Sequence, residues 1–473
     1  MLRVSSFVLI AGLIFVSELA IAAEPFRAGA ATSNITPDIG REIIGGFVPF
    51  PSTHVHDELH ARCLVLDDGK TRLAFVVCDL LGIHRVVSDE SRRLIAAETG
   101  IPRTHVLVCA THTHSASSAL GSHRFQHDQE LDDYQRFVTR RIADGVIRAT
   151  NNLRPAELAF GTAEAPEHVF NRRWSMRPGS IPPNPFGGAD LAKMNPPSGS
   201  DNLVEPVGPT DPTISFLAIR DLTGRPISLF ASYSLHYVGG VGRGHVSADY
   251  FAVFCKELEH LLDAEQQEPP FVPMLANGTS GDINNINFRQ PRPRQESYAQ
   301  MRFVGQDVAR KVHAALQGLE YQRQPTLAAS YREAEIAYRR PDAEMLEWAN
   351  KTLARGQQSP RDLSFIYAGR VLRMAEYPQT ASVPLQVFRI GHVGIGTMPC
   401  EVFCEIGLDF KRRSALQPAF LVSLAHGYLG YLPTPRQHAL GGYETWLGTN
   451  RLTLNASEVM LDELLDMAAE LKP

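Results

Sequence analysis

The sequence predicts an α/β protein in which mixed β-sheets are flanked by helices. Short apolar runs of strand-forming residues alternate along the chain with segments whose apolar residues recur at helical spacing. In one stretch a strand, a helix and a second strand follow one another directly, which predicts parallel pairing of the two strands. Elsewhere two strands are joined by the turn TGRP, which predicts an antiparallel hairpin.

The strand–helix–strand stretch is the first complete unit. TRLAFVVCDL, at 71–80, predicts a buried strand. Residues 86–100 predict a helix with Ser88 as its N-cap and Gly100 as its C-cap. Residues 104–110 predict the second strand. Ligands of such sheets gather at the carboxyl ends of the strands, so polar residues that follow these strands are candidates for a site.

The remaining elements follow from the same periodicities. Residues 171–212 are rich in Pro, Gly and Asn and predict a long loop, which in a compact domain is usually functional or mobile. Further strands are predicted within 213–221, 227–237, 271–285, 326–338, 383–401 and 420–433. Further helices are predicted over 132–149, 251–262, 341–356 and in the C-terminal segment, whose apolar residues at 461, 464, 465, 468 and 471 form a stripe.

The N-terminus predicts a cleavable export signal over residues 1–23. Arg3 precedes an apolar run from Phe7 to Val16, and small residues follow before Glu24. The run is too short to span a bilayer comfortably, and no later segment is long and apolar enough. We therefore expect a secreted or periplasmic protein with no integral membrane span and a single mature domain over 24–473.

Composition argues against a nucleic-acid partner and against a cysteine zinc site. Of the 473 residues, 44% are hydrophobic and 21% are charged, as in an ordinary soluble globular protein. A formal net charge of −5 provides no basic surface for a nucleic acid. Six cysteines permit disulfides in an exported chain, but the apolar surroundings of Cys78 and Cys109 favour buried thiols, and no CxxC zinc pattern is present.

Four predicted strand ends carry side chains that can bind a metal ion. THTH provides His112 and His114, SLHYVGG provides His236, MPCE provides Glu401, and GYLGYLP provides Tyr428 and Tyr431. Two neutral imidazoles and a carboxylate form a common hydrolytic zinc set, in which a water at the open position becomes a nucleophile near neutral pH. Simpler interpretations exist, because a histidine at a strand end is usually hydrogen-bonded structure and Glu401 could stabilise the N-terminus of the following helix.

Several short motifs, in this order, resemble those of the neutral ceramidase family. They are TSNITP near residue 32, THTHS at 111–115, NRR at 171–173, LHY at 235–237, NGTSGDINN at 277–285, PCE at 399–401, and YLGYLPTP followed by YE between 428 and 444. The resemblance implies the catalytic domain of a zinc-dependent amidase of α/β fold that cleaves N-acylsphingosine. It implies Zn²⁺ ligands at His112, His236, Glu401 and Tyr431, with substrate contacts from His114, Arg172 and Tyr443.

These residues fit the hydrolysis of an amide by metal-activated water. His114, Arg172 and Tyr443 are suitable donors to the oxyanion or to the leaving group, and His114 can also carry a proton. The expected protein is an exported zinc hydrolase. Its expected substrate is a small-molecule acyl amide or a related acyl compound, with a sphingolipid as the family's example.

The chain departs from the family pattern in two places. Asn284 stands where the family has a serine that is proposed to be catalytic. An amide side chain cannot be a nucleophile but can donate to an oxyanion, so Asn284 is a fourth candidate catalytic residue and a metal-water route is favoured. The chain ends 30 residues beyond Tyr443, so we expect the family's C-terminal β-sandwich domain to be absent.

Three other functions stay open. One is a different metallohydrolase with an HxH motif, such as an amidohydrolase barrel or a metallo-β-lactamase fold, although Ser115 and Ala116 follow the pair where the latter requires HxHxDH. Another is a saccharide-directed hydrolase or lyase on the same scaffold, which would use the polar loop 171–202. The third is a non-catalytic homologue that binds a metal or ligand, although it would not explain four retained candidate ligands.

Overall fold

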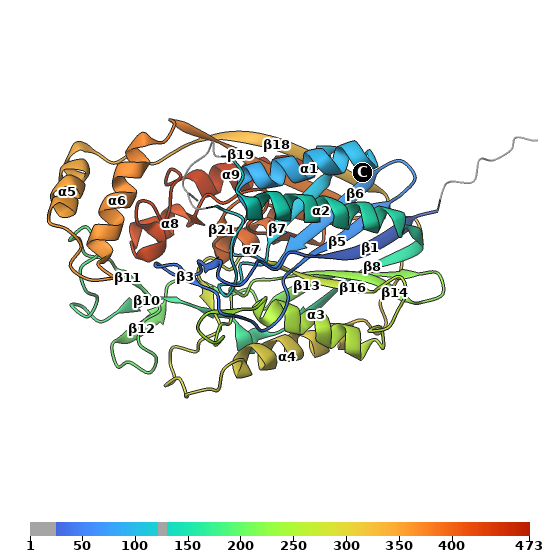
Figure 1. The fold of residues 1–473 in the computed structure, drawn as a ribbon, viewed down its shortest axis with the longest axis horizontal. Helices are drawn as coiled ribbons and strands as arrows, with labels where there is room; N and C mark the ends of the chain where they lie inside the picture. Colours follow the sequence, from blue (N-terminus) through green and yellow to red (C-terminus); the bar gives the residue numbers. More distant parts are fainter. Residues whose placement is uncertain (1–24, 122–129) are drawn as a thin grey trace, which may run out of the picture.

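The computed structural model describes residues 25–121 and 130–473, so the expected export signal at 1–23 lies outside the described residues. Its central element is an eight-stranded sheet with the order β16-β14-β13-β8-β1-β5-β6-β7 (Figure 1). The pairs β14–β16 and β6–β7 are parallel and the others are antiparallel. The strands are β1 (Arg27–Asn34), β5 (His60–Asp67), β6 (Arg72–Cys78), β7 (Val106–Ala110), β8 (Arg154–Glu164), β13 (Thr213–Asp221), β14 (Pro226–Tyr233) and β16 (Val272–Asn277).

Two pairs of helices cover one face of this sheet. They are α1 (Arg85–Thr99) with α2 (Asp133–Asn151), and α3 (Asp249–Leu261) with α4 (Ala299–Ala315). In β6, Val76 shares a core with α1 and α2, whereas Phe75 belongs to the core on the opposite face. In β13, Phe216 shares a core with α3 and α4, whereas Leu217 points to the opposite face. Apolar residues on both faces of a strand are typical of a sheet that is covered on both sides.

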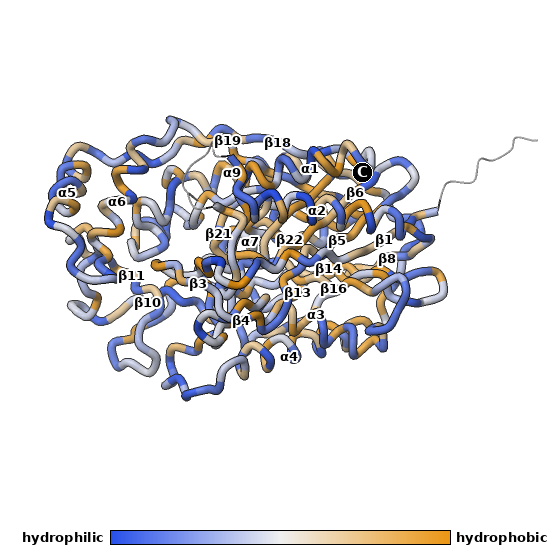
Figure 2. The backbone as a smooth tube through the Cα atoms, viewed as in Figure 1, coloured by the Kyte–Doolittle hydropathy of each residue, from blue (hydrophilic) through white to orange (hydrophobic). Residues whose placement is uncertain are grey.

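A second sheet, of four strands, packs against the opposite face. Its order is β18 (Leu327–Ala337), β19 (Thr380–Ile390), β20 (Val393–Thr397), β22 (Ala419–Val422). The rings of Phe75 and Phe388 meet between the two sheets with centroids 4.9 Å apart. The outer face of the second sheet shares a core with α5 (Ala343–Ala354), α6 (Leu363–Glu376), α7 (Cys404–Arg413) and α9 (Ala456–Glu470). Helix, sheet, sheet and helix form four layers, and Figure 2 shows hydrophobic residues gathered along the central strands. The predicted class, α/β with mixed sheets flanked by helices, is confirmed.

The large sheet curls so that its two ends approach each other. The segment after β22 lies between them, because the Ala110 N–H donates to the Leu424 carbonyl at 3.2 Å and the Ser423 N–H donates to the Asn277 carbonyl at 2.9 Å. The Asn277 side chain also donates to the Thr111 carbonyl at 2.9 Å. This curl brings the carboxyl ends of β7, β14 and β16 to one place.

Most predicted elements are present, with two notable differences. Helix α1 has His84 rather than Ser88 as its N-cap, because the His84 side chain accepts from the Val86 N–H while Ser88 is buried within the helix. Gly100 is the C-cap, with a φ of 74°.

The predicted loop 171–212 contains short strands that pair with one another, β10 (Arg173–Met176), β11 (Ala192–Met194) and β12 (Leu203–Pro206). They are too short for a period-two pattern to mark them in the sequence.

The described residues carry neither a disulfide nor a helix suited to cross a membrane. All six cysteines are buried with free thiols, as interpreted for Cys78 and Cys109. Within residues 25–121 and 130–473, each helix is too short or too polar for a membrane span.

Candidate metal centre

His112 lies just beyond the end of β7 in an unusual backbone conformation. Its φ is 70°, in the left-handed region that residues other than glycine rarely adopt and that is often found at functional sites. Its backbone N–H donates to the Leu80 carbonyl at 2.9 Å, and its Nδ1 donates to the Leu81 carbonyl at 2.6 Å. A carbonyl oxygen only accepts, so Nδ1 carries the proton and Nε2 presents its lone pair.

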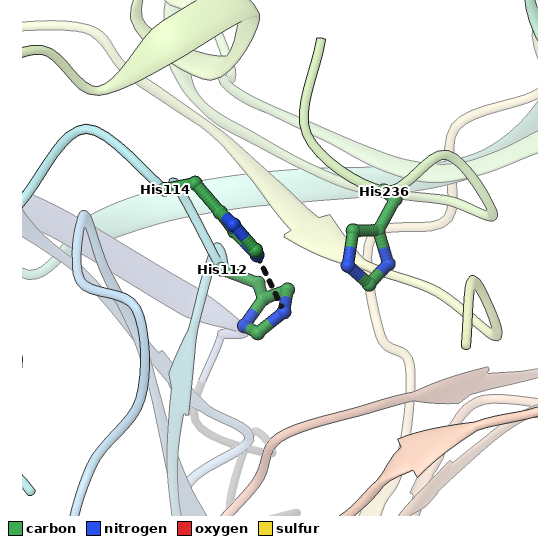
Figure 3. Close-up of side chains that lie close together, drawn as sticks. All are labelled: His112, His114 and His236. Atoms are coloured by element: carbon green, nitrogen blue, oxygen red, sulfur yellow. Dashed lines mark hydrogen bonds between the residues drawn. The ribbon is translucent and has the colours of Figure 1, made fainter. Parts of the chain in front are cut away.

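His236 reaches the same place from the other end of the curled sheet. It follows β14, and its Nδ1 donates to the Ser280 carbonyl at 3.0 Å, so Nε2 again presents a lone pair. Ser280 belongs to the loop after β16. The rings of His112 and His236 lie 4.6 Å apart and nearly perpendicular. Figure 3 shows the two rings converging with His114, and one nitrogen of each of these histidines lies within 4.8 Å of those of the others.

Glu401 and Tyr431 are neighbours on two very short strands. β21 (Glu401–Val402) and β23 (Tyr431–Leu432) pair in parallel, with Glu401 opposite Tyr431. The Glu401 Oε2 atom lies 3.2 Å from His112 Nε2 and 3.6 Å from His236 Nε2. The other oxygen, Oε1, accepts a 2.7 Å hydrogen bond from the Tyr428 hydroxyl. The four predicted metal ligands thus come together from distant parts of the chain.

The donor atoms of this group fit a metal ion. His236 Nε2 and Glu401 Oε2 are buried and form no hydrogen bond with any described residue. Buried polar atoms are normally satisfied, so two unsatisfied acceptors that face each other indicate a site for a cation. Imidazole nitrogens and a carboxylate are donors that Zn²⁺ prefers, and a phenol oxygen can complete four-fold coordination.

Burial and neighbouring charges set the protonation of the cluster. Burial, followed by the charge of His112, holds the pKa values of His114 and His236 well below the usual range. Burial alone would raise the pKa of Glu401, but His112, His236 and the Tyr431 phenol outweigh it and hold that pKa below the usual range. A neutral His236 beside an ionised Glu401 gives the protonation states in which these two groups bind metals.

A cavity opens beside the predicted ligands. Its volume is about 90 Å³, and its wall includes His112, Glu401 and Tyr431 together with the predicted substrate residues His114 and Tyr443. The Nε2 atoms of His114 and His112 are 3.1 Å apart (Figure 3). The ring of Tyr443 lies 5.7 Å from that of Tyr431. Both predicted substrate residues can therefore touch a molecule in this cavity.

Arg172 is buried next to Tyr431 and does not itself line the cavity. Its Cζ lies 5.3 Å from the Tyr431 ring centroid. Its Nε donates to Glu444 Oε1 at 2.9 Å, while Arg173 Nη1 donates to the other oxygen of Glu444 at 2.7 Å. The Nη2 atom of Arg172 is buried without a hydrogen bond to any described residue, so one donor is available at the edge of the site.

Asn284 lies apart from the group that surrounds the cavity. Its Nδ2 donates to Asn195 Oδ1 at 3.1 Å, its strand partner is Phe170, and its side chain is not part of the cavity wall. The nearby hydroxyl of Ser280 donates to Asn277 Oδ1 at 2.7 Å. Asp79, the other polar residue at the end of a predicted strand, forms a buried ion pair with Arg62 rather than joining the histidines.

Two residues of the site have roles that the sequence did not predict. The motif GYLGYLP provided Tyr428 and Tyr431 as candidate ligands, and the family resemblance selected Tyr431; in the structure the Tyr428 hydroxyl donates to Glu401. Glu444 was noted as part of the YE motif, but its role as the shared counter-ion of Arg172 and Arg173 depends on contacts across more than 270 residues. Its position beside Tyr443 was the one available signal.

A second group of ligand-type residues has an ordinary explanation. Glu167, His168 and Asp307 are close enough to hold a metal. However, Lys311 Nζ lies 2.6 Å from Glu167 Oε1, and His168 Nε2 lies 2.8 Å from Asp307 Oδ2. We assign this group to ion pairing and hydrogen bonding among its own side chains and Lys311.

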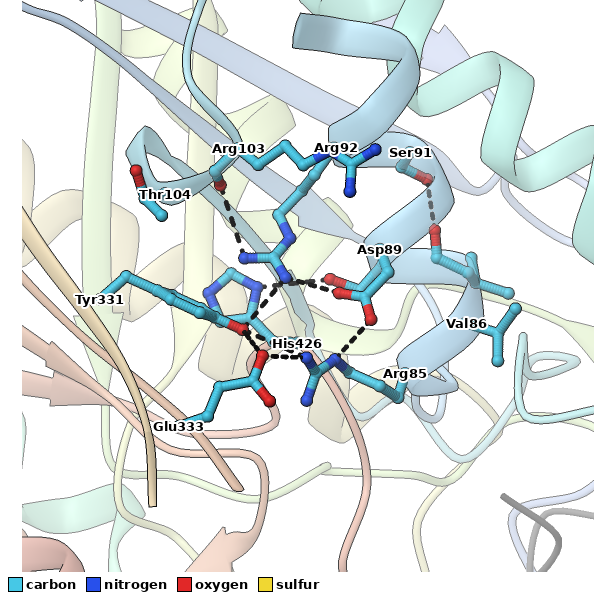
Figure 4. Close-up of polar contacts among 12 residues, drawn as sticks. Arg85, Val86, Asp89, Ser91, Arg92, Arg103, Thr104, Tyr331, Glu333 and His426 are labelled. Carbon is cyan, nitrogen blue, oxygen red and sulfur yellow. Dashed lines mark hydrogen bonds and ion pairs between the residues drawn. The ribbon is translucent and has the colours of Figure 1, made fainter. Parts of the chain in front are cut away.

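A polar network supports the segment that leads to the two tyrosines. His426 is fully buried with a φ of 64°, and its ring nitrogens lie 2.7 Å from Gln386 Oε1 and 3.3 Å from Ser88 Oγ. Beside it, Asp89 forms ion pairs with Arg85 and Arg92 of helix α1, as Figure 4 shows. Helix α1 and the second sheet therefore hold this segment from both sides.

Solved structures of known enzymes share this fold. The neutral ceramidase from Pseudomonas aeruginosa is similar with a TM-score of 0.68 and 20% sequence identity, over 95% of this chain and 74% of that chain. A ceramidase complexed with C2 is similar with a TM-score of 0.71 and 20% identity, over 95% of this chain and 75% of that chain. At this identity the likeness shows the fold alone.

A family model connects the fold to a sequence family. The model described as neutral/alkaline non-lysosomal ceramidase, N-terminal, matches residues 26–294, which is more than half of the 473 residues. The match includes the THTHS and LHY motifs, whereas Glu401 and Tyr431 lie beyond it. The chain therefore belongs to the neutral/alkaline non-lysosomal ceramidase family.

Proposed function

We propose that this protein is a zinc-dependent amidase that hydrolyses the N-acyl bond of a small acyl amide, of which ceramide is one candidate. The observation that carries the proposal is the buried pair His236 Nε2 and Glu401 Oε2, which lie 3.6 Å apart and form no hydrogen bond with any described residue. Such a pair is costly in a protein interior without a cation. Membership of a ceramidase family supports amide hydrolysis as the reaction.

The proposed zinc ligands are His112, His236, Glu401 and Tyr431. When bound, the ion would lower the pKa of a water molecule and polarise an acyl carbonyl. The protein's own contribution is to fix the tautomer of each histidine through the Leu81 and Ser280 carbonyls.

The remaining side chains would handle protons and charge. His114 lines the cavity beside His112, so it can accept a proton from the attacking water and return it to the leaving amine. Tyr443, on the cavity wall, and the unpaired Nη2 of Arg172 are suited to donate to the oxyanion that forms on the carbonyl. Neither Arg172 nor Asn284 is part of the cavity wall, but Arg172 packs against the ring of the proposed ligand Tyr431, whereas the Asn284 side chain is bonded to Asn195, so Asn284 has the weaker support. In this reaction the C–N bond breaks and an acid and an amine are released.

We also propose that residues 1–23 are a cleavable export signal and that 24–473 form the mature catalytic unit. Support comes from Arg3, the apolar run that follows it and the small residues before Glu24. N-terminal sequencing of the mature protein should begin near Glu24. A mature protein that retains Met1 would contradict the signal.

Metal content tests the proposed site most directly. Inductively coupled plasma mass spectrometry of protein purified without chelator should find about one zinc per chain. His112→Ala and Glu401→Ala should each lose the zinc and the hydrolysis of N-acyl amides. His392→Ala removes an exposed histidine on the turn after β19 and should keep both. Full zinc occupancy in either site variant would show that the ligand set is wrong, and hydrolysis of glycosides instead of amides would show that the reaction is wrong.

A further inference from the structure

The imidazole of His114 is covered on one face by the ring of Tyr237. The two ring centroids lie 3.7 Å apart and the ring planes are inclined by only 14°, which is the geometry of a stacked pair. The His114 Nε2 atom lies 3.1 Å from the Nε2 atom of His112 (Figure 3). Tyr237 therefore contacts the side chain to which the proposed function assigns the proton transfers.

Tyr237 reaches the cavity only through another side chain. It directly follows the proposed ligand His236, but, unlike His114, it is not part of the cavity wall. Its ring centroid is 5.5 Å from that of His236, so the stack on His114 is the closer of the two contacts. Burial raises the pKa of Tyr237, and its hydroxyl forms no hydrogen bond with any described residue. The ring thus acts on His114 as an uncharged surface.

The turn after Tyr237 packs against its ring. A Cβ on Gly239, whose φ is 75°, would lie 3.2 Å from Tyr237 Cε2, so the backbone passes close to the ring edge. The fully buried carboxylate of Asp249 fixes this turn, because its Oδ1 accepts from the Val238 N–H at 3.2 Å and its Oδ2 accepts from the Gly239 N–H at 2.8 Å. The ring that stacks on His114 is therefore itself held in place.

A histidine that transfers protons has to keep its nitrogens in fixed directions. The torsion about the Cβ–Cγ bond of histidine has broad minima, so its intrinsic preference leaves the plane of the ring loosely defined. A quarter turn of the His114 ring would drive one of its edges into Tyr237, because stacked rings 3.7 Å apart are already in contact. The stack therefore fixes the plane of the imidazole, and with it the direction of Nε2.

We propose that Tyr237 is a positioning residue for the hydrolysis, whose ring keeps His114 Nε2 directed at the attacking water and at the leaving amine. The proposal rests on the proposed function, in which His114 accepts a proton as water adds to the acyl carbon and returns it to the nitrogen as the C–N bond breaks. Tyr237 exchanges no proton and does not touch the substrate. A displacement of about 1 Å at such a group can cost about 100-fold in rate.

Substitutions at Tyr237 separate the stacked ring from the hydroxyl. With N-acetylsphingosine as the probe, Tyr237→Phe keeps the ring and should keep kcat within twofold. Tyr237→Leu removes the stack and should lower kcat at least tenfold, with KM changed less than threefold and the zinc content unchanged. Tyr321→Leu is the control, because the Tyr321 ring packs against Arg220 and is not part of the cavity wall. Its kcat should equal that of the wild type.

A double variant tests whether Tyr237 acts through His114. In a His114→Ala background there is no imidazole to position, so Tyr237→Leu should lower the remaining kcat less than twofold. Losses that multiply in the double variant would show that Tyr237 supports the structure in general, and they would overturn the proposal.

Two adjacent glycines decide the question should Tyr237→Leu fail to fold. Gly239 and Gly240 have φ values of 75° and 74°, but a Cβ on Gly240 would meet no atom within 4 Å. The two alanine variants therefore share the same backbone strain, and only Gly239→Ala presses on the ring of Tyr237. The kcat of Gly239→Ala should be at least threefold below that of Gly240→Ala. Equal values would overturn the proposal.

An NMR measurement separates this proposal from the proposed function. The ring current of Tyr237 should move the Hε1 signal of His114 upfield, and His114→Ala assigns that signal. The signal should keep its position in Tyr237→Phe and move downfield in Tyr237→Leu. A downfield move with unchanged kcat would overturn the positioning role and leave the amidase intact. The same move in a protein whose wild type does not hydrolyse the probe would uphold the fixed orientation of His114 and overturn the amidase.

Discussion

The hydroxyl of Tyr428 donates a 2.7 Å hydrogen bond to Oε1 of Glu401, so that the second oxygen, Oε2, faces His112 and His236. This bond fixes the rotation of the carboxylate. Tyr428→Phe should therefore weaken zinc binding about 10- to 100-fold, as is usual when the partner of a metal ligand is lost. Competition with a chelator of known zinc affinity measures the change.

Tyr321→Phe is the matched control for this substitution. Its ring packs against the Arg220 guanidinium, with Cζ 3.6 Å from the ring centroid, and it takes no part in the cavity wall. Zinc affinity should not change in this variant. Wild-type affinity in Tyr428→Phe would mean that the carboxylate is held by other contacts.

Removal of zinc should destabilise the protein, because the ion binds a site that exists only in the folded chain. A ligand at about 100 times its Kd adds about 2.7 kcal/mol to the free energy of unfolding. Chelator treatment should thus lower Tm by several degrees, and added zinc should restore it. In His112→Ala neither treatment should shift Tm. An unchanged Tm in the wild type would argue against a metal ion at this site.

The buried ion pairs of Glu444 should be essential for folding stability. Glu444 accepts hydrogen bonds from Arg172 Nε at 2.9 Å and from Arg173 Nη1 at 2.7 Å. All three side chains are at most 4% exposed. Glu444→Gln leaves two buried guanidinium groups without their counter-charge, so the free energy of unfolding should fall by about 3–5 kcal/mol. Urea unfolding measures this difference.

An exposed pair provides the comparison for Glu444. Glu347 and Lys351 are one turn apart on helix α5, and both side chains are at least 65% exposed. Glu347→Gln should leave the urea midpoint unchanged, because solvent screens such pairs. If Glu444→Gln is as well tolerated as Glu347→Gln, the two arginines must have access to water or to another anion.

The parts of the fold that could be predicted from the sequence depend on local patterns. The apolar runs at 71–80 and 104–110 and the helix between them needed only periodicity and a C-terminal glycine, and all three are present. His112 and His236 were noticed for a similar reason, since each directly follows an apolar strand. A pattern of this kind predicts which residues stand at a strand end, but not which strand ends meet.

The rest of the site depends on contacts that no local pattern records. β7 and β14 lie near opposite ends of the large sheet, and their histidines meet only because the sheet curls and the segment around Leu424 bridges its ends. Helix α6 was not predicted, so Arg370 of the cavity wall had no place in the expected site. The N-cap at His84 was missed because Ser88, a favoured capping residue, is instead bonded to His426.

Gly45 and Gly46 are adjacent residues that should respond very differently to a methyl group. A Cβ on Gly45 would lie 2.3 Å from the His114 carbonyl oxygen and 2.7 Å from its Cα, whereas a Cβ on Gly46 would meet no atom within 4 Å. Gly45→Ala must therefore displace His114 or the segment around Gly45 that packs against it. A displacement of about 1 Å at a catalytic group can cost about 100-fold in rate, so kcat/KM for an N-acyl amide should fall at least tenfold in Gly45→Ala and stay within twofold in Gly46→Ala. Zinc content should be unchanged in both, because His114 is not one of the proposed ligands. Loss of zinc in Gly45→Ala would indicate that His114 is a zinc ligand. Equal activity in the two variants would indicate that His114 does not transfer a proton in the reaction.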